Sequence, residues 1–279
     1  IAYKAEHDDS RLFSEITELL EKSVKAHMQK KEFLKQLMDM GNHGPLSLLS
    51  MNLDGDPYYM IENSRFLVGV LGLNEMVQYH TGQEMHESKE ALKFGLKVTA
   101  YMKKECDRLA AEHGVKLPLE AYRFAKLDLK EYPEQAGKVV KGNKETNNVY
   151  YTNSTYLNVG ADVSPIDRVK IEGMFHPLIE AGALTHIWLG ESRPTPESVA
   201  AFVVKTFRNT QNTQIAFSPE FTSCLDCGQT SRGLTETCSK CGSGNIEGIT
   251  RVTGFFSKIS GWNKGKIGEL RDRTKGQCF

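Results

Sequence analysis

Apolar residues recur every three to four positions in two long stretches of the chain, and this spacing predicts two amphipathic helices. The first stretch covers residues 8–40, and the Gly- and Pro-containing run at residues 41–45 predicts where that helix ends. The second stretch covers residues 88–113 and contains Cys106. We interpret Cys106 as a small core residue rather than a reactive thiol. We interpret His43 as a structural or solvated side chain of the loop between the helices.

Short, continuous apolar runs predict buried strands elsewhere in the chain. Residues 66–71 form such a run, which turns at Gly72 into a helix with Asn74 near its start. The later elements alternate in the same way: a β-rich run at residues 149–155, a helix that begins at Ser164 and Pro165 and extends to Leu178, a strand at residues 184–190, a helix at residues 198–206 and a strand at residues 214–217 that stops before Pro219. Strands that alternate with helices over about 215 residues indicate an α/β layer or barrel.

The composition of the chain excludes two kinds of partner. Lys and Arg together number 35 of the 279 residues, and Asp and Glu also number 35. Without excess positive charge, nothing global favours nucleic acid or an anionic membrane surface. No run approaches 18 apolar residues and the first residues lack a signal-peptide pattern, so we expect a soluble cytoplasmic protein. Ile1 to Tyr3 lack an initiator Met and resemble the end of a strand, so we also expect a piece of a longer enzyme.

Four of the six cysteines form two C-x-x-C pairs near the C-terminal end, Cys224 with Cys227 and Cys238 with Cys241. The pairs are ten residues apart, and glycines lie close to both. Two knuckles of this kind bring four thiolates into the tetrahedron typical of structural zinc sites. Four protein ligands leave no open position, so such a Zn²⁺ ion folds the segment rather than catalysing a reaction. Two disulfides fit less well because the cysteines are so concentrated, and an iron–sulfur cluster is the weaker alternative.

A zinc ribbon is often a module that binds nucleic acid or protein, and nucleic-acid binding needs a basic surface. The charged residues of this loop are Asp226, Glu236, Glu247, Arg232 and Lys240. Because acidic residues outnumber basic ones, we expect the ribbon to support a neighbouring element instead.

The neighbouring element is the run from Arg251 to Phe256, with Gly254 in its middle. The ordinary interpretation is a strand whose glycine permits a bulge or a close backbone approach. The chemical interpretation is that glycine has two α-hydrogens and no Cβ, so loss of one hydrogen leaves a radical conjugated with both adjacent amides. The apolar neighbours Val252, Phe255 and Phe256 are then expected to keep water away from Gly254.

A second candidate site follows the β-rich run after residue 149. Thr152, Asn153, Ser154 and Thr155 offer hydroxyl, amide and backbone N–H donors to a phosphate or another anion. An ordinary strand-to-turn transition has the same composition, so this pattern alone is weak.

Taken together, residues 251–273 resemble the C-terminal segment of glycyl radical enzymes, and the four-cysteine clip before them is typical of the anaerobic (class III) ribonucleotide reductases. Upstream segments resemble the same family in the same order: residues 68–81, residues 120–128, and residues 150–154, which resemble the loop that holds the substrate phosphates. The resemblance covers nearly the whole chain, and only its C-terminal part is highly specific.

The resemblance implies the second half of a ten-stranded α/β barrel, with the radical loop inserted into its centre. The expected divisions are residues 1–218 for the barrel part, residues 219–250 for the zinc module, and residues 251–279 for the radical loop and terminal helix. It also implies a homodimer.

The activity implied by the resemblance is the reduction of ribonucleoside triphosphates to deoxyribonucleoside triphosphates. A separate iron–sulfur activating enzyme that uses S-adenosylmethionine installs the radical on Gly254. The radical then passes to a cysteine, whose thiyl abstracts the ribose 3′-hydrogen, and formate or a thiol protein acts as the reductant.

The sequence departs from the family at one point, because none of its six cysteines matches the thiyl cysteine. Four belong to the clip, Cys106 lies in a helix and Cys278 lies near the C-terminal end. We therefore expect the chain to be inactive without the N-terminal part of the same enzyme. The alternatives are a glycyl radical enzyme of the formate-lyase type, whose motif is similar but lacks the clip, and a zinc-ribbon binding protein without chemistry.

Overall fold

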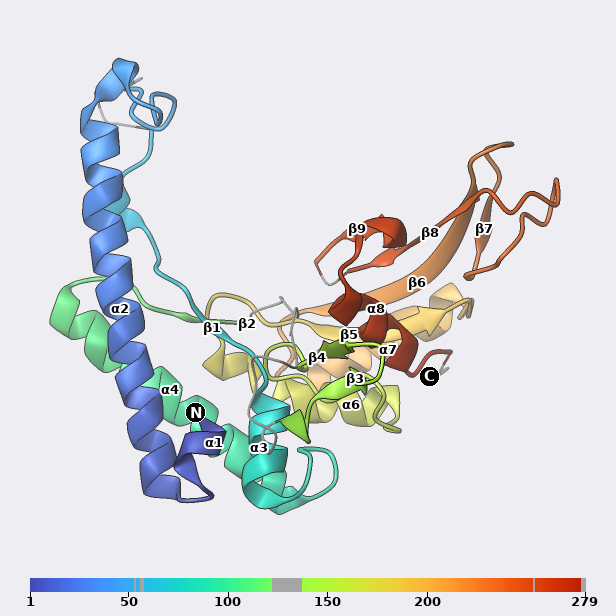
Figure 1. Cartoon of the computed structure of the whole chain (residues 1–279), viewed down its shortest axis with the longest axis horizontal. Coiled ribbons are helices and arrows are strands. Elements are labelled where there is room, and N and C mark those ends of the chain that lie inside the picture. The colour runs from blue at the N-terminus through green and yellow to red at the C-terminus, as the bar shows by residue number, and fades with distance from the viewer. Residues whose placement is uncertain (53, 56–57, 122–136, 253, 277–279) are drawn as a thin grey trace.

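The computed structural model describes residues 1–279 except 53, 56–57, 122–136, 253 and 277–279, and shows a mixed α/β fold (Figure 1). Its α-helices are α1 (Ala2–Ala5), α2 (Asp9–Asp39), α3 (Leu73–Thr81), α4 (Lys89–His113), α6 (Pro165–Gly173), α7 (Pro196–Asn209) and α8 (Lys264–Asp272). Its strands are β1 (Val68–Val70), β2 (Leu119–Ala121), β3 (Lys141–Asn143), β4 (Asn148–Tyr150), β5 (Thr185–Gly190), β6 (Ile215–Cys224), β7 (Thr230–Arg232), β8 (Ile246–Arg251) and β9 (Phe256–Lys258). Short 3₁₀ turns include η1 (Gly41–His43) and η5 (Ile259–Gly261).

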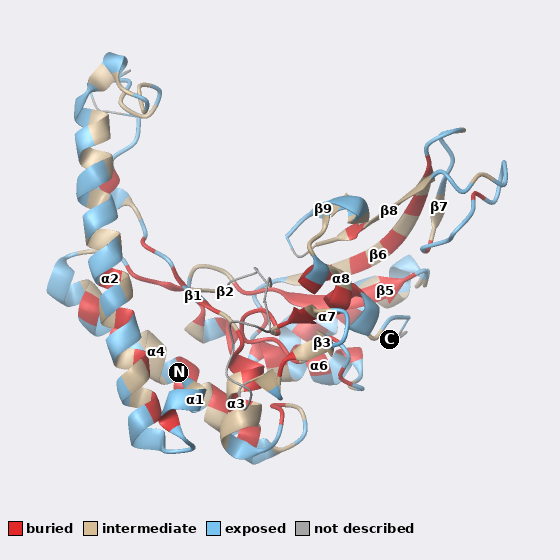
Figure 2. Ribbon diagram, viewed as in Figure 1, coloured by how far each residue is buried: buried red, intermediate tan, exposed pale blue. Residues whose placement is uncertain are grey.

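The two predicted long helices are confirmed as α2 and α4, which pack against each other at one side of the molecule (Figure 1). Each begins at a residue whose side chain accepts a hydrogen bond from the first turn, Asp8 for α2 and Ser88 for α4. The buried stripe of α2 faces α4, whereas the rest of α2 is largely exposed (Figure 2). Cys106 is buried in the resulting core, as predicted.

One expectation for the N-terminal part is wrong. Residues Ile1 to Tyr3 do not end a strand, because Ala2 to Ala5 form the short helix α1, which packs on α2. The predicted strand at residues 66–71 and the following helix are confirmed as β1 and α3, with Asn74 in the first turn of the helix. Gly72 precedes it in the left-handed region (φ 72°), and the Asn74 amide donates to Glu84 at 2.8 Å.

The largest sheet among the described residues has the order β5-β6-β8-β9, with β7 also paired to β6. All six residues of β5 are buried, as its apolar run predicts. The strand expected to stop before Pro219 does not stop there, because β6 continues to Cys224. At Pro219 the strand changes its main partner, from the parallel neighbour β5 to the antiparallel neighbour β8. A proline has no N–H to donate, so a change of partner is a position where a strand tolerates it.

Helix α8 lies directly over the hairpin of β3 and β4 (Figure 1). Asn263 caps its N-terminus, and the Tyr150 hydroxyl donates to Asp272 at 2.8 Å near its C-terminus. A Cβ added at Gly268 would overlap the carbonyl oxygen of Asn148. Gly268 therefore permits the close packing that brings α8 against β4.

In the described part of the chain, no helix is long and apolar enough to cross a membrane. Most of the predicted family segment at residues 120–128 lies outside the described residues.

We predict that Gly268→Ala lowers the free energy of unfolding by about 1–3 kcal/mol, because the added methyl group forces α8 away from β4. Urea unfolding followed by circular dichroism measures the change. Gly261→Ala is the matched control, since a Cβ at Gly261 would meet nothing within 4 Å. Equal stability of the two variants would show that the contact between α8 and β4 is not tight.

Candidate functional site: a four-cysteine cluster and a glycine hairpin

The four predicted cysteine ligands come together at one end of the sheet. The Sγ atoms of Cys224 and Cys241 are 3.6 Å apart, those of Cys227 and Cys238 are 3.7 Å apart, and all four lie within 4.8 Å of one another. A tetrahedron with Zn–S bonds of about 2.3 Å places its sulfurs about 3.8 Å apart. None of the four is in a disulfide. The cluster therefore fits a zinc ion.

Each C-x-x-C pair forms a knuckle closed by the glycine that follows it. The N–H of Gly228 donates to the Cys224 carbonyl, and the N–H of Gly242 donates to the Cys238 carbonyl. Both glycines adopt the left-handed backbone conformation, with φ of 72° and 74°. Two knuckles with matching geometry present the four sulfurs from opposite sides.

The thiols cannot all ionise on their own. Backbone N–H groups of Cys241 and Lys240 lower the pKa of Cys238 to about 6. The Ser243 N–H lowers the pKa of Cys241, but Cys227 and the other cysteines outweigh it and raise that pKa to about 12. Negative charge crowded in this way needs a cation to balance it, which a divalent metal supplies.

The cluster and Gly254 lie at opposite ends of strand β8. Cys224 pairs with Ile246 where β6 ends and β8 begins, whereas Arg251 pairs with Phe256 at the other end of β8. The six residues of β8, at about 3.3 Å each, span about 20 Å. Gly254 lies in the turn between β8 and β9.

The turn around Gly254 has its own hydrogen bonds. The Val252 N–H donates to the Phe255 carbonyl at 3.0 Å, and the Arg251 guanidinium donates to the Gly254 carbonyl at 2.8 Å. Gly254 is exposed, and Phe255 and Phe256 are 66% and 42% exposed. The expectation that these apolar neighbours cover Gly254 is therefore wrong for this part of the molecule, because the Phe255 ring is exposed and the Phe256 ring packs toward Arg251 and Phe221.

The predicted anion loop, Thr152 to Thr155, follows β4, and all four residues are buried. The Thr152 hydroxyl and N–H both donate to the carboxylate of Glu75, at 2.6 and 3.1 Å. The Asn153 amide donates to Glu269 of α8 at 2.9 Å. Two of the four predicted residues thus already donate to internal carboxylates.

Ser154 is the member of this loop that is best placed for a ligand. Its φ of 51° is in the left-handed region, which a residue with a side chain seldom adopts. Its hydroxyl and the Asn153 Oδ1 are buried, and neither has a hydrogen-bond partner within the described residues. A strained serine with a buried, unpaired hydroxyl is consistent with a site for a polar ligand.

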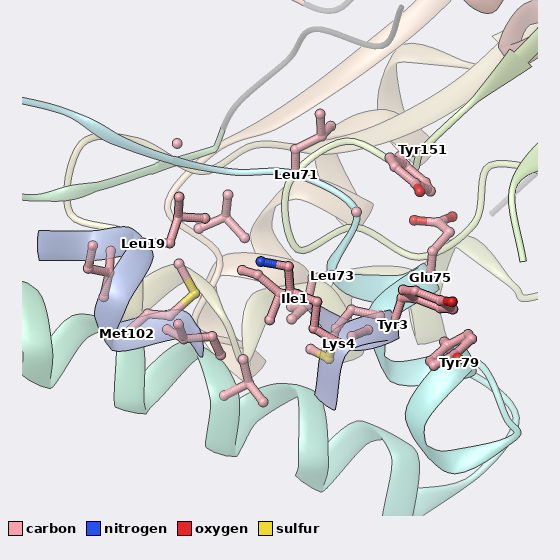
Figure 3. Close-up of a pocket in the computed structure, with 18 of the residues that line it drawn as sticks. Ile1, Tyr3, Lys4, Leu19, Leu71, Leu73, Glu75, Tyr79, Met102 and Tyr151 are labelled. Carbon is pink, nitrogen blue, oxygen red and sulfur yellow. The ribbon is translucent and has the colours of Figure 1, made fainter. Parts of the chain in front are cut away.

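Glu75 also lies at the wall of an apolar cavity of about 600 Å³, which is bordered by α1, α2, α3, α4 and β1. Its carboxyl group lies between Tyr151 and Tyr79 in the view of Figure 3. Burial raises the pKa of Glu75, and the hydrogen bond from the Thr152 hydroxyl lowers it by a smaller amount. The carboxyl group therefore gains a proton more readily than an exposed one and repels a nearby anion less.

A cluster of buried charges anchors α8 beside this loop. The carboxylate of Glu269 contacts Lys266 and accepts a hydrogen bond from Arg273 at 2.9 Å. Burial by itself raises the pKa of Glu269, but Lys266 and Arg273 outweigh burial and lower it, so the carboxylate stays ionised. The Arg273 guanidinium lies 3.8 Å from the ring centre of Trp188 and 5.5 Å from that of Trp262.

Sequence reasoning did not single out Glu75, Glu269, Lys266 or Arg273. Lys266 and Glu269 of α8 and Arg273 just after it are spaced three and four positions apart, which is also the pattern of an exposed salt-bridged helix. Their apolar surroundings come from β4 and β5, far away in the sequence, so the helix pattern alone held no signal of burial.

The remaining candidate residues, Cys106, His43 and Cys278, are not part of a site among the described residues. Burial raises the pKa of Cys106 to about 12, which leaves the thiol protonated and unreactive. His43 is exposed at the end of η1. Cys278 lies outside the described residues.

Comparison with known proteins identifies the family. The model of the family "Anaerobic ribonucleoside-triphosphate reductase" matches residues 1–275. The chain belongs to this family. The anaerobic ribonucleoside-triphosphate reductase of Escherichia coli K12 is 24% identical over 247 residues, covering 81% of this chain and 33% of the relative. That of bacteriophage T4 is 25% identical over 239 residues, covering 80% of this chain and 37% of the relative.

Solved structures of anaerobic ribonucleotide reductases have the same fold over this region. One aligns with a TM-score of 0.75 at 16% identity, and the alignment covers 100% of this chain and 43% of the chain in that structure. The enzyme of Thermotoga maritima, solved in complex with dATP and CTP, aligns with a TM-score of 0.70 at 16% identity, covering 96% and 42%. The chain thus spans a third to less than half of the length of these reductases.

We predict that the purified chain binds about one zinc ion, and that Cys227→Ser abolishes tight binding because the tetrahedron loses a ligand. Elemental analysis after dialysis against a chelator measures the metal, and thermal unfolding measures the accompanying loss of stability. Cys106→Ser, which alters a buried thiol outside the cluster, should keep its zinc. Retention of zinc by the Cys227 variant would contradict the four-ligand site.

Proposed function

We propose that this chain is the portion of an anaerobic ribonucleoside-triphosphate reductase that carries the radical glycine, the zinc clip and the substrate-phosphate loop. The observation that carries the proposal is the placement of Gly254 just beyond one end of β8, whose other end lies beside the four-cysteine cluster. The family match over residues 1–275 supports the substrate class.

Gly254 stores the radical in this proposal. An activating enzyme with an iron–sulfur cluster reductively cleaves S-adenosylmethionine, and the resulting 5′-deoxyadenosyl radical removes one α-hydrogen from Gly254. Gly254 later regains a hydrogen from the thiol of a cysteine outside this chain, which becomes the thiyl. That thiyl abstracts the ribose 3′-hydrogen, the 2′-hydroxyl leaves as water, and formate or a thiol protein supplies the two electrons of the net reduction.

The cysteine clip has a structural role in this proposal. Four thiolates occupy every position of a tetrahedral zinc ion, so no position is open to substrate or water. The ion instead fixes the end of β6 to the start of β8. Strand β8, fixed at its start, then holds the position of the turn with Gly254 at its other end.

The loop of Thr152, Asn153, Ser154 and Thr155 is the proposed contact for the triphosphate of a ribonucleotide. The unpaired Ser154 hydroxyl supports this role most directly. Since Thr152 and Asn153 donate to Glu75 and Glu269, we propose that they shape the loop and that Ser154 and Thr155 supply side-chain contacts.

The rest of the enzyme supplies what this chain lacks. We propose that residues 1–218 complete a ten-stranded barrel with the N-terminal part of the same enzyme, in a cytoplasmic homodimer. Residues 219–250 then form the zinc module, and residues 251–279 the radical loop and terminal helix. The barrel, rather than Phe255 and Phe256, is proposed to shield the exposed Gly254 from water and oxygen.

Two alternatives make different predictions. A glycyl radical enzyme that acts on acyl groups would not bind ribonucleotides tightly. A zinc-ribbon binding protein without chemistry would be unaffected by Gly254→Ala but would lose function with its zinc.

The test is electron paramagnetic resonance under anaerobic conditions, with the chain, its N-terminal part, the activating enzyme and S-adenosylmethionine. We predict a doublet from coupling to the one remaining α-hydrogen, absent from Gly254→Ala and present in the control variant Gly261→Ala. A zinc-loaded, folded protein that gives no doublet would contradict the radical role of Gly254.

A further inference from the structure

Four hydrogen bonds and the covalent side chain of Arg251 form a series that joins the proposed phosphate loop to Gly254 and passes through one carboxylate. On the loop side, the Asn153 Nδ2 donates to the Glu269 Oε2 at 2.9 Å. These residues are 116 positions apart, and both are buried. The first connection therefore joins two segments that the chain itself does not hold together.

On the glycine side, the other oxygen of Glu269 continues the series. The Glu269 Oε1 accepts from the Arg273 Nη2 at 2.9 Å, and the same nitrogen donates to the Arg251 carbonyl at 3.1 Å. The Arg251 Nη2 then donates to the Gly254 carbonyl at 2.8 Å. Arg251 is thus held through its carbonyl on one side and holds the glycine on the other.

The central part of this series is buried. The side chains of Glu269, Lys266 and Arg273 are at most 5% exposed, and the Arg273 guanidinium packs against Trp188. Removing one member of a buried ion cluster leaves the other charges uncompensated, so the members hold one another in place. The last hydrogen bond, from Arg251 to Gly254, is exposed, so its position depends on how firmly Arg273 holds the Arg251 carbonyl.

We propose that Glu269 is a positioning residue that couples the conformation of the phosphate loop to that of the Gly254 turn. The nucleotide-dependent part of this inference rests on the proposed function. A triphosphate bound at Ser154 would fix Asn153, and Glu269 with Arg273 would carry that order to Arg251 and to Gly254. The radical glycine would then be held most firmly when substrate is bound.

Glu172 provides a matched control within the same chain. It is also a buried glutamate paired with an arginine four residues away, Arg168, at 3.0 Å. Its carboxylate accepts from the Leu157 N–H at 3.1 Å and from Arg168 at 3.0 Å, and neither partner belongs to α8 or to the glycine hairpin. Glu172→Gln thus tests the loss of a buried carboxylate without breaking the series.

The first arm uses hydrogen–deuterium exchange of the zinc-loaded chain without nucleotide. We expect Asn153→Ala alone to speed exchange at residues 251–256 several-fold relative to the parent chain. In a chain that already carries Glu269→Gln, we expect Asn153→Ala to cause no further increase in exchange at these residues. Glu269→Gln should speed exchange there and leave β5 unchanged, whereas a general loss of stability would speed exchange in β5 as well. Unchanged exchange at residues 251–256 in Asn153→Ala, or equal effects of Glu269→Gln and Glu172→Gln, would overturn the coupling.

In the second arm, the chain is joined to the N-terminal part of the enzyme, and exchange is measured with and without CTP and Mg²⁺. We expect slower exchange at residues 150–157 in the parent and in both glutamate variants, and slower exchange at residues 251–256 in all but Glu269→Gln. Protection at residues 251–256 that persists in Glu269→Gln would overturn the role of Glu269. If CTP protects neither segment in the parent, the proposed substrate site fails, while the first arm still decides the coupling.

Discussion

The buried carboxylate of Glu269 is the constraint on which the C-terminal half of the molecule depends. A carboxylate removed from water is stable only when its oxygens are paired, and here Oε2 contacts Asn153 and Lys266 while Oε1 accepts from Arg273. Lys266 and Arg273 neutralise the charge, whereas Asn153 brings the loop after β4 to the same point. One side chain therefore fixes α8 relative to the loop and to the hairpin.

The hairpin is restrained from both ends. At one end, the cysteine cluster holds the start of β8 to the end of β6. At the other end, Arg273 holds the carbonyl of Arg251, the last residue of β8. Between these points the antiparallel ladder with β6 holds β8, whereas Gly254 in the turn that follows is exposed.

Much of this arrangement was predictable because it depends on local pattern. Helical spacing located α2 and α4, continuous apolar runs located β1 and β5, and the C-x-x-C spacing located the cysteine cluster. Predictions failed where a distant partner decides the structure. The residues around Ile1 to Tyr3 do not indicate that a short helix packs on α2 there. The residues around Pro219 do not indicate that the residues after it pair with β8.

The site was predictable to the same extent and for the same reason. The composition of Thr152 to Thr155 indicated hydrogen-bond donors, but it did not show that Glu75 and Glu269 take two of them. Those glutamates lie 77 and 116 residues from their partners, and the charge pattern around Glu269 in α8 resembles an exposed surface. Burial of a charge depends on tertiary contacts, so a local pattern does not contain it.

The measurement that tests this account most directly is a crystal structure of the zinc-loaded chain, joined to its N-terminal part, with CTP bound. The account predicts the triphosphate within hydrogen-bond distance of the Ser154 hydroxyl while Asn153 still donates to Glu269 and Arg273 to the Arg251 carbonyl. A triphosphate bound away from this loop, or an Asn153 amide turned from Glu269 to the phosphates, would contradict it.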